Sequence, residues 1–193
     1  MENTGLKVTS YKESPLAEMA KIKDHGRISD EDAQLLLYLS RMSNGDIVEI
    51  GCHTGQTTRM LAAGNPDKYI IGIDWSGSPT MNDFQVSEHL PAKSVGESAR
   101  GIYNIQILDM VSWGFKFPST TGMVFVDGDH SARGLILDFA NIISQLESGI
   151  VVFHDYYASA PEWCAVNAFV NGFLSYHFLV NHITGTNCTW IEL

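Results

Sequence analysis

The sequence predicts an α/β fold in which a doubly wound, mostly parallel sheet carries helices on both faces. Short runs rich in isoleucine and valine lack polar alternation, as strands buried on both faces do. Segments with helical spacing of apolar residues separate these runs, and such alternation is typical of parallel sheets. Two strand-like runs at the end, joined by a short loop with a glycine, indicate an antiparallel last strand.

Length and composition indicate one globular domain. The chain has 193 residues, and we expect a single domain over residues 29–193, preceded by an arm and a helix over residues 1–28. Apolar residues make up 45% of the sequence, which is enough for a buried core. The 12 basic and 22 acidic residues give a net charge of −10, which argues against nucleic acid as a partner.

The sequence shows no membrane or disulfide signal. No apolar run approaches the roughly 20 residues that span a bilayer, and the polar N-terminus lacks a signal-peptide core. Cys52, Cys164 and Cys188 are too widely spaced for a zinc motif and indicate buried free thiols. We therefore expect a cytoplasmic protein without a membrane partner. No surface pattern determines the oligomeric state, and a homodimer is compatible with the sequence.

Two helices are predicted before the first strand. Pro15 is suited to the start of a helix that runs to about Asp24. Ser29 is a plausible N-cap for a second helix over residues 30–43, because acidic residues fill its first turn. The apolar residues that keep helical spacing there are Leu35, Leu36, Leu39 and Met42.

Five apolar runs are the predicted parallel strands. Helices are expected between them, most clearly over residues 131–146 and around 163–173. The closing hairpin is predicted from residues 177–181 and 188–192. Residues 76–103 form the longest poorly patterned connection, and connections of this kind are often substrate lids. The five parallel runs are residues 46–50, 69–73, 104–108, 122–126 and 149–153.

The first strand leads into a glycine-bearing loop, Val48-Glu49-Ile50-Gly51-Cys52-His53-Thr54-Gly55. Open α/β sheets bind nucleotide-like ligands at such a turn. A dinucleotide fingerprint needs a glycine where the backbone meets the pyrophosphate, and His53 stands there instead. The charge of Glu49 disfavours phosphate and suits an ammonium group. The loop therefore favours a cationic ligand without phosphate.

Acidic residues also end the second and third strands. Asp74 comes about 20 positions after Gly51, where a carboxylate can accept hydrogen bonds from both ribose hydroxyls. Trp75 beside it can cover a nucleobase or pack on the lid. Asp109, followed by Met110, can meet the exocyclic amine of adenine. The structural alternatives are a capping or loop role for Asp74 and capping of the next short helix by Asp109.

Ionisable residues end the fourth and fifth strands. Adjacent parallel strands would bring Asp127 and Asp155 close together, and two facing carboxylates repel unless they share a proton or a cation. Such oxygen ligands suit Mg²⁺ or Ca²⁺. His130 or His154 could act as a base. The carboxylates could instead only hold a cofactor, and His154 could be structural.

Taken together, these segments resemble the class I S-adenosylmethionine-dependent methyltransferases from about residue 28 onward. VEIGCHTGQTT, IIGIDWS and IQILDM are similar to the family's first three motifs, and the closing hairpin fits its reversed seventh strand. The resemblance implies a Rossmann-like, seven-stranded sheet. It also implies that S-adenosylmethionine contacts Glu49, Gly51, His53, Thr54, Gly55, Asp74, Trp75, Asp109, Met110 and Asp127.

Two further segments narrow the resemblance. MVFVDGDHSARG and GIVVFHDYY are similar to a bacterial and phage-type branch of small-molecule O-methyltransferases. In related catechol-type and sugar enzymes, acids at these strand ends hold Mg²⁺, which implies Asp127 and Asp155 as metal ligands. Tyr156 stands where the catechol-type enzymes have asparagine, and Ala132 stands where the branch usually has tyrosine.

The resemblance implies transfer of a methyl group from S-adenosylmethionine to a hydroxyl of a small molecule. Asp127, His130 and His154 are then the catalytic candidates, and a divalent cation or a histidine would help to remove the hydroxyl proton. Two alternatives stay open: a non-catalytic S-adenosylmethionine-binding protein on the same fold, and a nicotinamide-dependent oxidoreductase. His53 and the lack of a second catalytic domain argue against the oxidoreductase.

Overall fold

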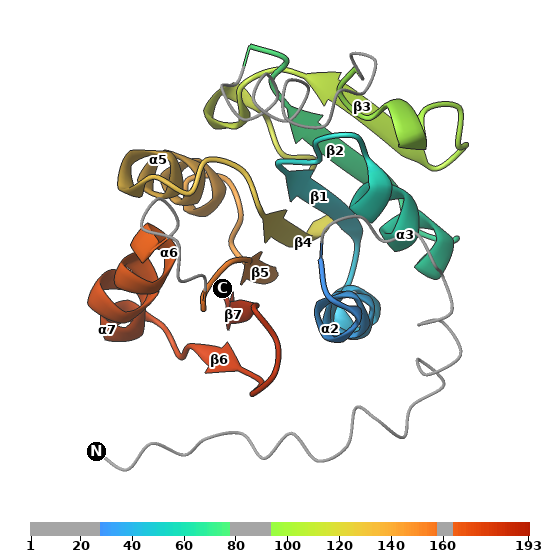
Figure 1. Ribbon diagram of the computed structural model, residues 1–193. Coiled ribbons are helices and arrows are strands. Elements are labelled where there is room, and N and C mark those ends of the chain that lie inside the picture. Colours follow the sequence, from blue (N-terminus) through green and yellow to red (C-terminus); the bar gives the residue numbers. More distant parts are fainter. Residues whose placement is uncertain (1–27, 78–93, 158–163) are drawn as a thin grey trace.

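The structure is a computed structural model that describes residues 28–77, 94–157 and 164–193. Within these ranges a seven-stranded sheet lies between two layers of helices (Figure 1). The strands are β1 (Asp46–Ile50), β2 (Ile70–Asp74), β3 (Ile105–Asp109), β4 (Thr121–Val126), β5 (Ile150–Phe153), β6 (Asn181–His182) and β7 (Thr189–Glu192). The α-helices are α2 (Asp30–Met42), α3 (Gln56–Gly64), α5 (Ala132–Ile143), α6 (Cys164–Phe169) and α7 (Ser175–His177).

The strand order is β3-β2-β1-β4-β5-β7-β6. The pairs from β3 to β5 are parallel, and β7 pairs antiparallel with both β5 and β6. This confirms the predicted doubly wound, mostly parallel sheet with a reversed last strand. In register, Ile50 lies beside Val126, and Val126 lies beside Phe153. The polar residues that follow these three strands therefore emerge at one edge of the sheet.

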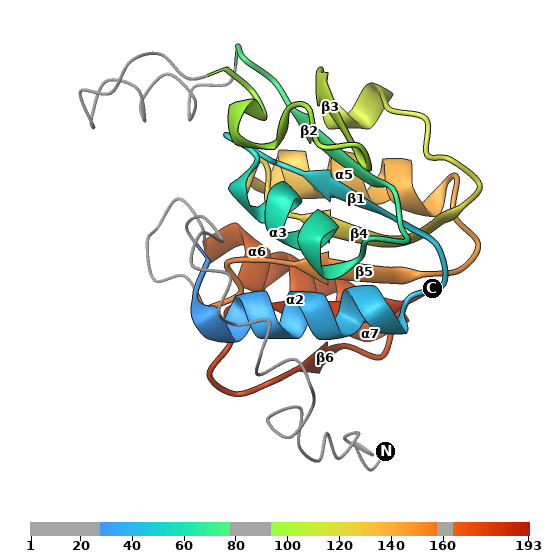
Figure 2. The same cartoon turned by 90° about the vertical axis from the view of Figure 1, so that its right-hand side faces the viewer.

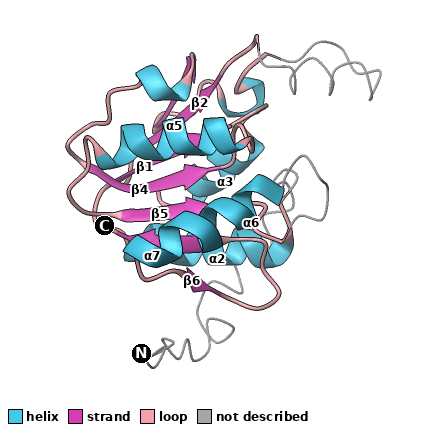
Figure 3. Cartoon of the chain, turned by 90° about the vertical axis from the view of Figure 1, so that its left-hand side faces the viewer, coloured by secondary structure: helices cyan, strands magenta, loops and turns pink. Residues whose placement is uncertain are grey.

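The two faces of the sheet have separate cores. Helices α2 and α3 cover one face (Figure 2), and α5, α6 and α7 cover the other (Figure 3). Alternate strand residues supply the two cores, because successive side chains of a strand point to opposite faces. Ile47 packs in the core that contains Leu36 of α2, whereas Val48 packs in the core that contains Phe139 of α5.

The capping signal at α2 is confirmed. Ser29 is the N-cap, and its hydroxyl accepts a hydrogen bond from the backbone N–H of Asp32 at 3.0 Å. The buried positions of the helix include Leu35, Leu36 and Leu39. Helix α5 is capped in the same way, because the Ser131 hydroxyl accepts a hydrogen bond from the N–H of Gly134.

The prediction of a strand over residues 177–181 is wrong. The helical pattern of α6 continues through a π-helical turn, Val170–Leu174, into α7, and the N–H of Phe178 still donates to Leu174. A π-turn adds one residue to the helical repeat, so the regular spacing of apolar residues is interrupted there. The helix predicted around residues 163–173 therefore continues to His177. Strand β6 consequently begins only at Asn181. The other predicted strands match within one residue.

Some expectations lie outside the described residues. These are the helix that starts at Pro15 and most of the connection over residues 76–103. The described part of that connection contains a short 3₁₀ turn, Glu97–Ala99. Among the helices that the structure describes, none combines the length and apolar character that crossing a membrane requires.

Candidate active site

The loop from Gly51 to Gly55, here called the glycine loop, packs tightly against its neighbours. Gly51 and Gly55 have φ angles of 92° and 84°, in the left-handed region that favours glycine. A side chain at Gly51 would overlap the carbonyl of Asp127, so this glycine lets the loop approach the end of β4. His53 is also left-handed, with φ 47°. The segment 94–99 holds the loop, since Gly96 donates to the carbonyl of His53 and Ser98 to that of Thr54.

The side chain of Glu49 lies beneath this loop rather than on its surface. It is 1% exposed and accepts a hydrogen bond from the hydroxyl of Thr58 on α3. Burial raises the pKa of Glu49 to about 8, and the charges of Asp127 and Asp74 add to the rise. At neutral pH this carboxyl is therefore mostly protonated, so Glu49 differs from the charged residue that the sequence suggested.

Asp74 connects the second strand to the glycine loop. One carboxylate oxygen accepts the N–H of His53 at 2.6 Å, and the other accepts the N–H of Trp75 at 2.7 Å. Burial raises the pKa of Asp74, although these two hydrogen bonds oppose the shift. Each oxygen keeps a second lone pair for a ligand. The loop role foreseen as an alternative is thus present.

Asp109 lies beside Asp74 in the register of β2 and β3. Its carboxylate accepts the N–H of Ser76 at 2.9 Å, so it holds the turn after β2 and does not cap the helical turn that follows it. Met110 is half-buried, and Trp75 is 49% exposed. The predicted cofactor residues of the first three strands therefore share one edge of the sheet.

Two aspartates and two histidines meet at the ends of β4 and β5, and this carboxylate–histidine cluster consists of Asp127, His130, His154 and Asp155. His130 Nε2 lies 3.4 Å from a carboxylate oxygen of each aspartate. His154 Nδ1 lies 3.1 Å from Asp127 and 3.3 Å from Asp155. The expected approach of the two carboxylates is thus present, and histidines stand between them.

His154 lies among three carboxylates. Its side chain is 9% exposed, and its Nε2 atom lies 3.4 Å from Asp32 of α2. Burial by itself lowers the pKa of His154, but Asp127, Asp155 and Asp32 together raise it to about 12. The converse holds for Asp127, where burial raises the pKa but His154 and His130 lower it below its usual value. With these neighbours, His154 is a cation at neutral pH.

Sequence reasoning missed two residues of this region, Asp32 and Asn187. Asp32 was expected only to favour the positive end of α2, yet it is buried and contacts His154. Asn187 precedes β7 in the turn after β6, and its side chain donates to Asp155 at 2.8 Å. The Ser29-x-x-Asp32 spacing was a weak signal for the first residue. No sequence pattern indicated Asn187, because only the fold brings it close to Asp155, 32 positions away.

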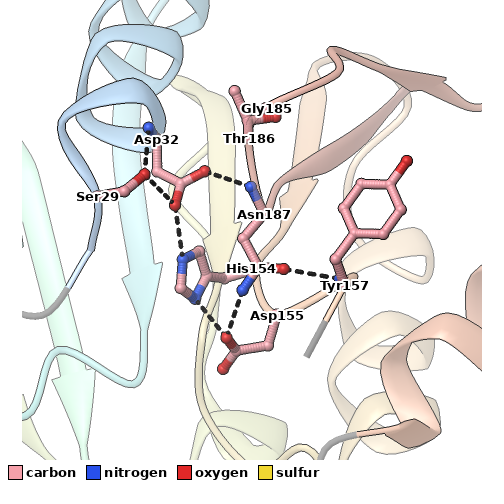
Figure 4. Close-up of a pocket in the computed structure, with 8 residues that line it drawn as sticks. All are labelled: Ser29, Asp32, His154, Asp155, Tyr157, Gly185, Thr186 and Asn187. Atoms are coloured by element: carbon pink, nitrogen blue, oxygen red, sulfur yellow. Dashed lines mark hydrogen bonds and ion pairs between the residues drawn. The ribbon is translucent and has the colours of Figure 1, made fainter. Parts of the chain in front are cut away.

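A pocket of about 520 Å³ opens beside the carboxylate–histidine cluster (Figure 4). The start of α2, the end of β5 and the turn after β6 form its walls. In Figure 4, His154 lies between Asp32 and Asp155. The lining residues are Ser29, Asp32, His154, Asp155, Tyr157, Gly185, Thr186 and Asn187. The lining combines two carboxylates and other polar groups with a similar amount of apolar surface, so it suits a ligand with hydroxyl groups on a carbon frame.

Two cysteines are described, and the Cys188 thiol lies within 4.8 Å of ligand atoms of Asp32 and His154. Cys52 and Cys188 are buried free thiols, as the sequence indicated. Burial raises the pKa of both thiols above the ordinary value, which keeps them unreactive.

Comparison with known proteins identifies the class. A family model described as a methyltransferase domain matches residues 48–156, more than half of the chain. The matched segment runs from the glycine loop to the end of the carboxylate–histidine cluster. No curated protein matches the sequence.

Solved structures of methyltransferases share the fold. TomG from Streptomyces achromogenes, an O-methyltransferase in complex with S-adenosylmethionine, has 18% identity and a TM-score of 0.56, with 97% of this chain and 92% of that one covered. PaMTH1 from Podospora anserina, a methyltransferase bound to S-adenosylhomocysteine, has 16% identity and a TM-score of 0.58, with 91% and 86% covered. CalS11, a TDP-rhamnose 3'-O-methyltransferase of calicheamicin biosynthesis, has 17% identity and a TM-score of 0.57, with 83% and 76% covered.

The sheet order, the glycine loop and the matched segment define a Rossmann-like methyltransferase. The chain belongs to the methyltransferase domain family. Its recognition as a methyltransferase with the Rossmann-like fold of class I enzymes is thereby confirmed. The narrower resemblance, which rests on the D-G-D-H-S segment, stays a prediction.

Proposed function

We propose that this enzyme transfers a methyl group from S-adenosylmethionine to a hydroxyl oxygen of a small molecule. One observation carries the proposal: the glycine loop, Asp74 and the carboxylate–histidine cluster share one edge of the sheet, with a polar pocket beside the cluster. Ligands of open α/β sheets bind outside the carboxyl ends of the strands. A cofactor at the loop and an acceptor in the pocket would then meet near Asp127.

The charges at this edge support a sulfonium cofactor. The charges of Asp127 and Asp74 raise the pKa of Glu49, and those of Asp109 and Asp127 raise the pKa of Asp74. A positively charged ligand relieves this repulsion, whereas a pyrophosphate adds to it. The observation favours S-adenosylmethionine over a nicotinamide dinucleotide.

The acceptor side of the proposal rests on the pocket. Its lining offers carboxylate, hydroxyl and amide groups, which hydrogen-bond to hydroxyls, and the ring of Tyr157 supplies an apolar surface. No lysine or arginine belongs to the described lining. A compact, hydroxylated and unphosphorylated molecule, such as a sugar or a hydroxylated secondary metabolite, fits this composition best.

Proton removal is assigned to His130. The acceptor hydroxyl must lose its proton as the oxygen takes the methyl group, and a histidine can accept it. His154 is held as a cation by Asp32, Asp127 and Asp155, so it has no free lone pair for this task. His130 Nε2 lies 3.4 Å from both Asp127 and Asp155, so it stands where the cofactor and the acceptor would meet.

A divalent cation in the cluster is a further part of the proposal. Carboxylate oxygens of Asp127 and Asp155 lie within 4.8 Å of each other, so these two residues would hold the ion while His130 takes the proton. The buried Nδ1 atom of His154 faces the two carboxylates without a hydrogen bond of good geometry, so this side of the cluster can still rearrange. Two carboxylates fit Mg²⁺ or Mn²⁺. When bound, such an ion lowers the pKa of a hydroxyl beside it.

The decisive experiment is a calorimetric titration with S-adenosylhomocysteine, with NAD as the comparison ligand. We expect S-adenosylhomocysteine to bind with a micromolar dissociation constant and NAD to show no binding. An absence of heat at millimolar S-adenosylhomocysteine contradicts the proposed cofactor. Methyl transfer from labelled S-adenosylmethionine to a panel of sugars and phenols then tests the acceptor class. If cofactor binds but no hydroxylated acceptor is methylated, the non-catalytic alternative is favoured.

A further inference from the structure

The turn that carries Asp155 has an unfavourable backbone conformation. Asp155 has a φ angle of 59°, in the left-handed region that residues with a Cβ atom rarely adopt. Such a conformation is unfavourable and persists only where surrounding contacts hold it. It points the carboxylate toward the cluster, with its two oxygens 3.3 Å from His154 and 3.4 Å from His130.

Asn187 supplies the contacts that hold this turn. Its carboxamide donates to Asp155 Oδ1 at 2.8 Å and accepts the N–H of Tyr157 at 2.7 Å. Its backbone carbonyl accepts the N–H of Tyr156 at 3.0 Å. One residue therefore binds all three residues of the turn.

Asn187 is itself attached to the first described helix. Its backbone N–H donates to Asp32 Oδ1 at 2.6 Å, and the other oxygen of Asp32 accepts the hydroxyl of Ser29 at 2.7 Å. Asp32 is buried, so water does not compete strongly for these bonds. Figure 4 shows the series from Ser29 through Asp32 and Asn187 to Asp155.

We propose that Asn187 is a positioning residue: its carboxamide fixes the left-handed turn and directs the Asp155 carboxylate into the carboxylate–histidine cluster. The functional part rests on the function proposed above, because the cluster is the assigned methyl-transfer site. Asparagine suits the position, since the turn needs one donor for a carboxylate and one acceptor for an N–H. Aspartate lacks the donor, and alanine lacks both.

Amide hydrogen exchange, followed by NMR on the full chain without ligands, tests the positioning. In Asn187→Ala we expect the N–H of Tyr157 to exchange about three- to tenfold faster, the range that loss of one hydrogen bond gives. The N–H of Tyr156 is the internal reference, because it donates to the backbone of residue 187. Asn181→Ala is the matched control, since that carboxamide on the same hairpin donates only a long bond, 3.4 Å, to Leu179.

A swap of the two side chains separates positioning from general stability. Asn187→Asp alone faces Asp155 with a second carboxylate, so we expect a lower Tm. Combining it with Asp155→Asn restores a donor–acceptor pair of the same size and charge, and the Tm should recover. The ring signals of His130 should shift in Asn187→Ala and stay shifted in the swap, because the carboxylate has left position 155.

Unchanged Tyr157 exchange and unchanged His130 signals in Asn187→Ala would overturn the proposal. Failure of the swap to recover the Tm lost in Asn187→Asp would do so as well. If Asn187→Ala does not fold, the Tm values of the isosteric Asn187→Asp and of the swap still test the proposal. These readouts need no cofactor, so a chain that fails to bind S-adenosylhomocysteine contradicts only the proposed function.

Discussion

The Nε2 atom of His154 lies 3.4 Å from the Oδ2 atom of Asp32, so the first described helix touches the end of the fifth strand. This contact joins two segments more than a hundred residues apart in sequence. Asp32 is 2% exposed. Burial tends to raise the pKa of Asp32, but His154, Ser29 and Asn187 lower it to about 2.

We expect Asp32→Asn to destabilise the protein by about 3 kcal/mol at pH 7, the typical cost of breaking a buried ion pair. Since the pKa of Asp32 is lower in the folded chain, its contribution is complete above pH 4 and declines as the pH falls toward 2. Urea unfolding at pH 7 measures the effect. Glu31→Gln, on the exposed side of the same helical turn, is the control, and equal losses in both variants would contradict the role of Asp32.

Asp138 has the opposite pH dependence. Burial raises the pKa of this α5 carboxyl to about 6, although a hydrogen bond from Ser112 opposes the shift. The folded state therefore retains the proton longer than the unfolded state. Its stability declines as the pH rises from 4 to 6, by about 3 kcal/mol for two pKa units, and then levels off.

We expect Asp138→Asn to remove this loss, because asparagine still accepts the Ser112 hydrogen bond and carries no charge. The variant should match the parent at pH 4 and exceed its stability at pH 7. Thermal unfolding at both pH values measures the difference, with the exposed substitution Glu147→Gln as control. A variant that is less stable than the parent at pH 7 would refute this account of the carboxyl.

Asp74→Ala tests the cofactor site. If Asp74 holds the ribose, calorimetry should show affinity for S-adenosylhomocysteine falling by about 100-fold or more, the result of losing two hydrogen bonds to a charged group. The substitution also removes the acceptor for the N–H of His53, so Asp74→Asn should fall in between. Asp67→Ala, in an exposed turn, should bind normally. An unchanged affinity in Asp74→Ala would remove the ribose role.

Gly51→Ala tests the close approach of the glycine loop to β4. A side chain there would overlap the backbone of Asp127 and would have to adopt a φ angle of 92°. We expect a loss of at least about 2 kcal/mol in unfolding free energy. Gly172→Ala has open space around it and should be neutral or stabilising by about 0.5 kcal/mol. Similar results for both glycines would mean that the loop can move away from β4.

Metal binding is tested with Mn²⁺ and electron paramagnetic resonance. The proposed cation should bind the parent, and Asp127→Asn should weaken it at least about tenfold because a charged ligand is lost. Asp129→Asn is the matched control, since its exposed side chain binds the N–H of Ser131 and asparagine keeps that acceptor. Once an acceptor is known, EDTA should abolish turnover. Equal rates with Mg²⁺ and with EDTA would reject a catalytic cation.

The sequence predicted the sheet well because its central strands are continuous apolar runs. Residues 46–50 match β1 fully, and the polar residues after each run marked the edge that carries the site. The approach of Asp127 to Asp155 followed from the adjacency of parallel strands. The hairpin was harder, because a π-turn between Val170 and Leu174 changes the helical period and extends the helix to His177.

Side-chain environments were less predictable than strand positions. Glu49 was expected to be charged although it lies in a strand predicted to be buried on both faces, and this burial raises its pKa. His154 was considered as a base until the fold placed Asp32 on its other nitrogen. Asn187 gave no signal at all, because its partners come from β5 and α2. Local patterns identify strand ends, whereas contacts between distant segments require the fold.

The reversed direction of β7 leaves room for functional diversification. Thr189 at its start pairs with Phe153 at the end of β5, so the turn that precedes β7 opens onto the acceptor pocket. The exposed part of this turn, Thr184 and Gly185, can gain or exchange residues without disturbing the pairing of the central strands. Related enzymes could therefore acquire new acceptors by replacing one short surface segment while the cofactor loop stays constant. For protein engineering, the same turn is the natural place to graft a different specificity.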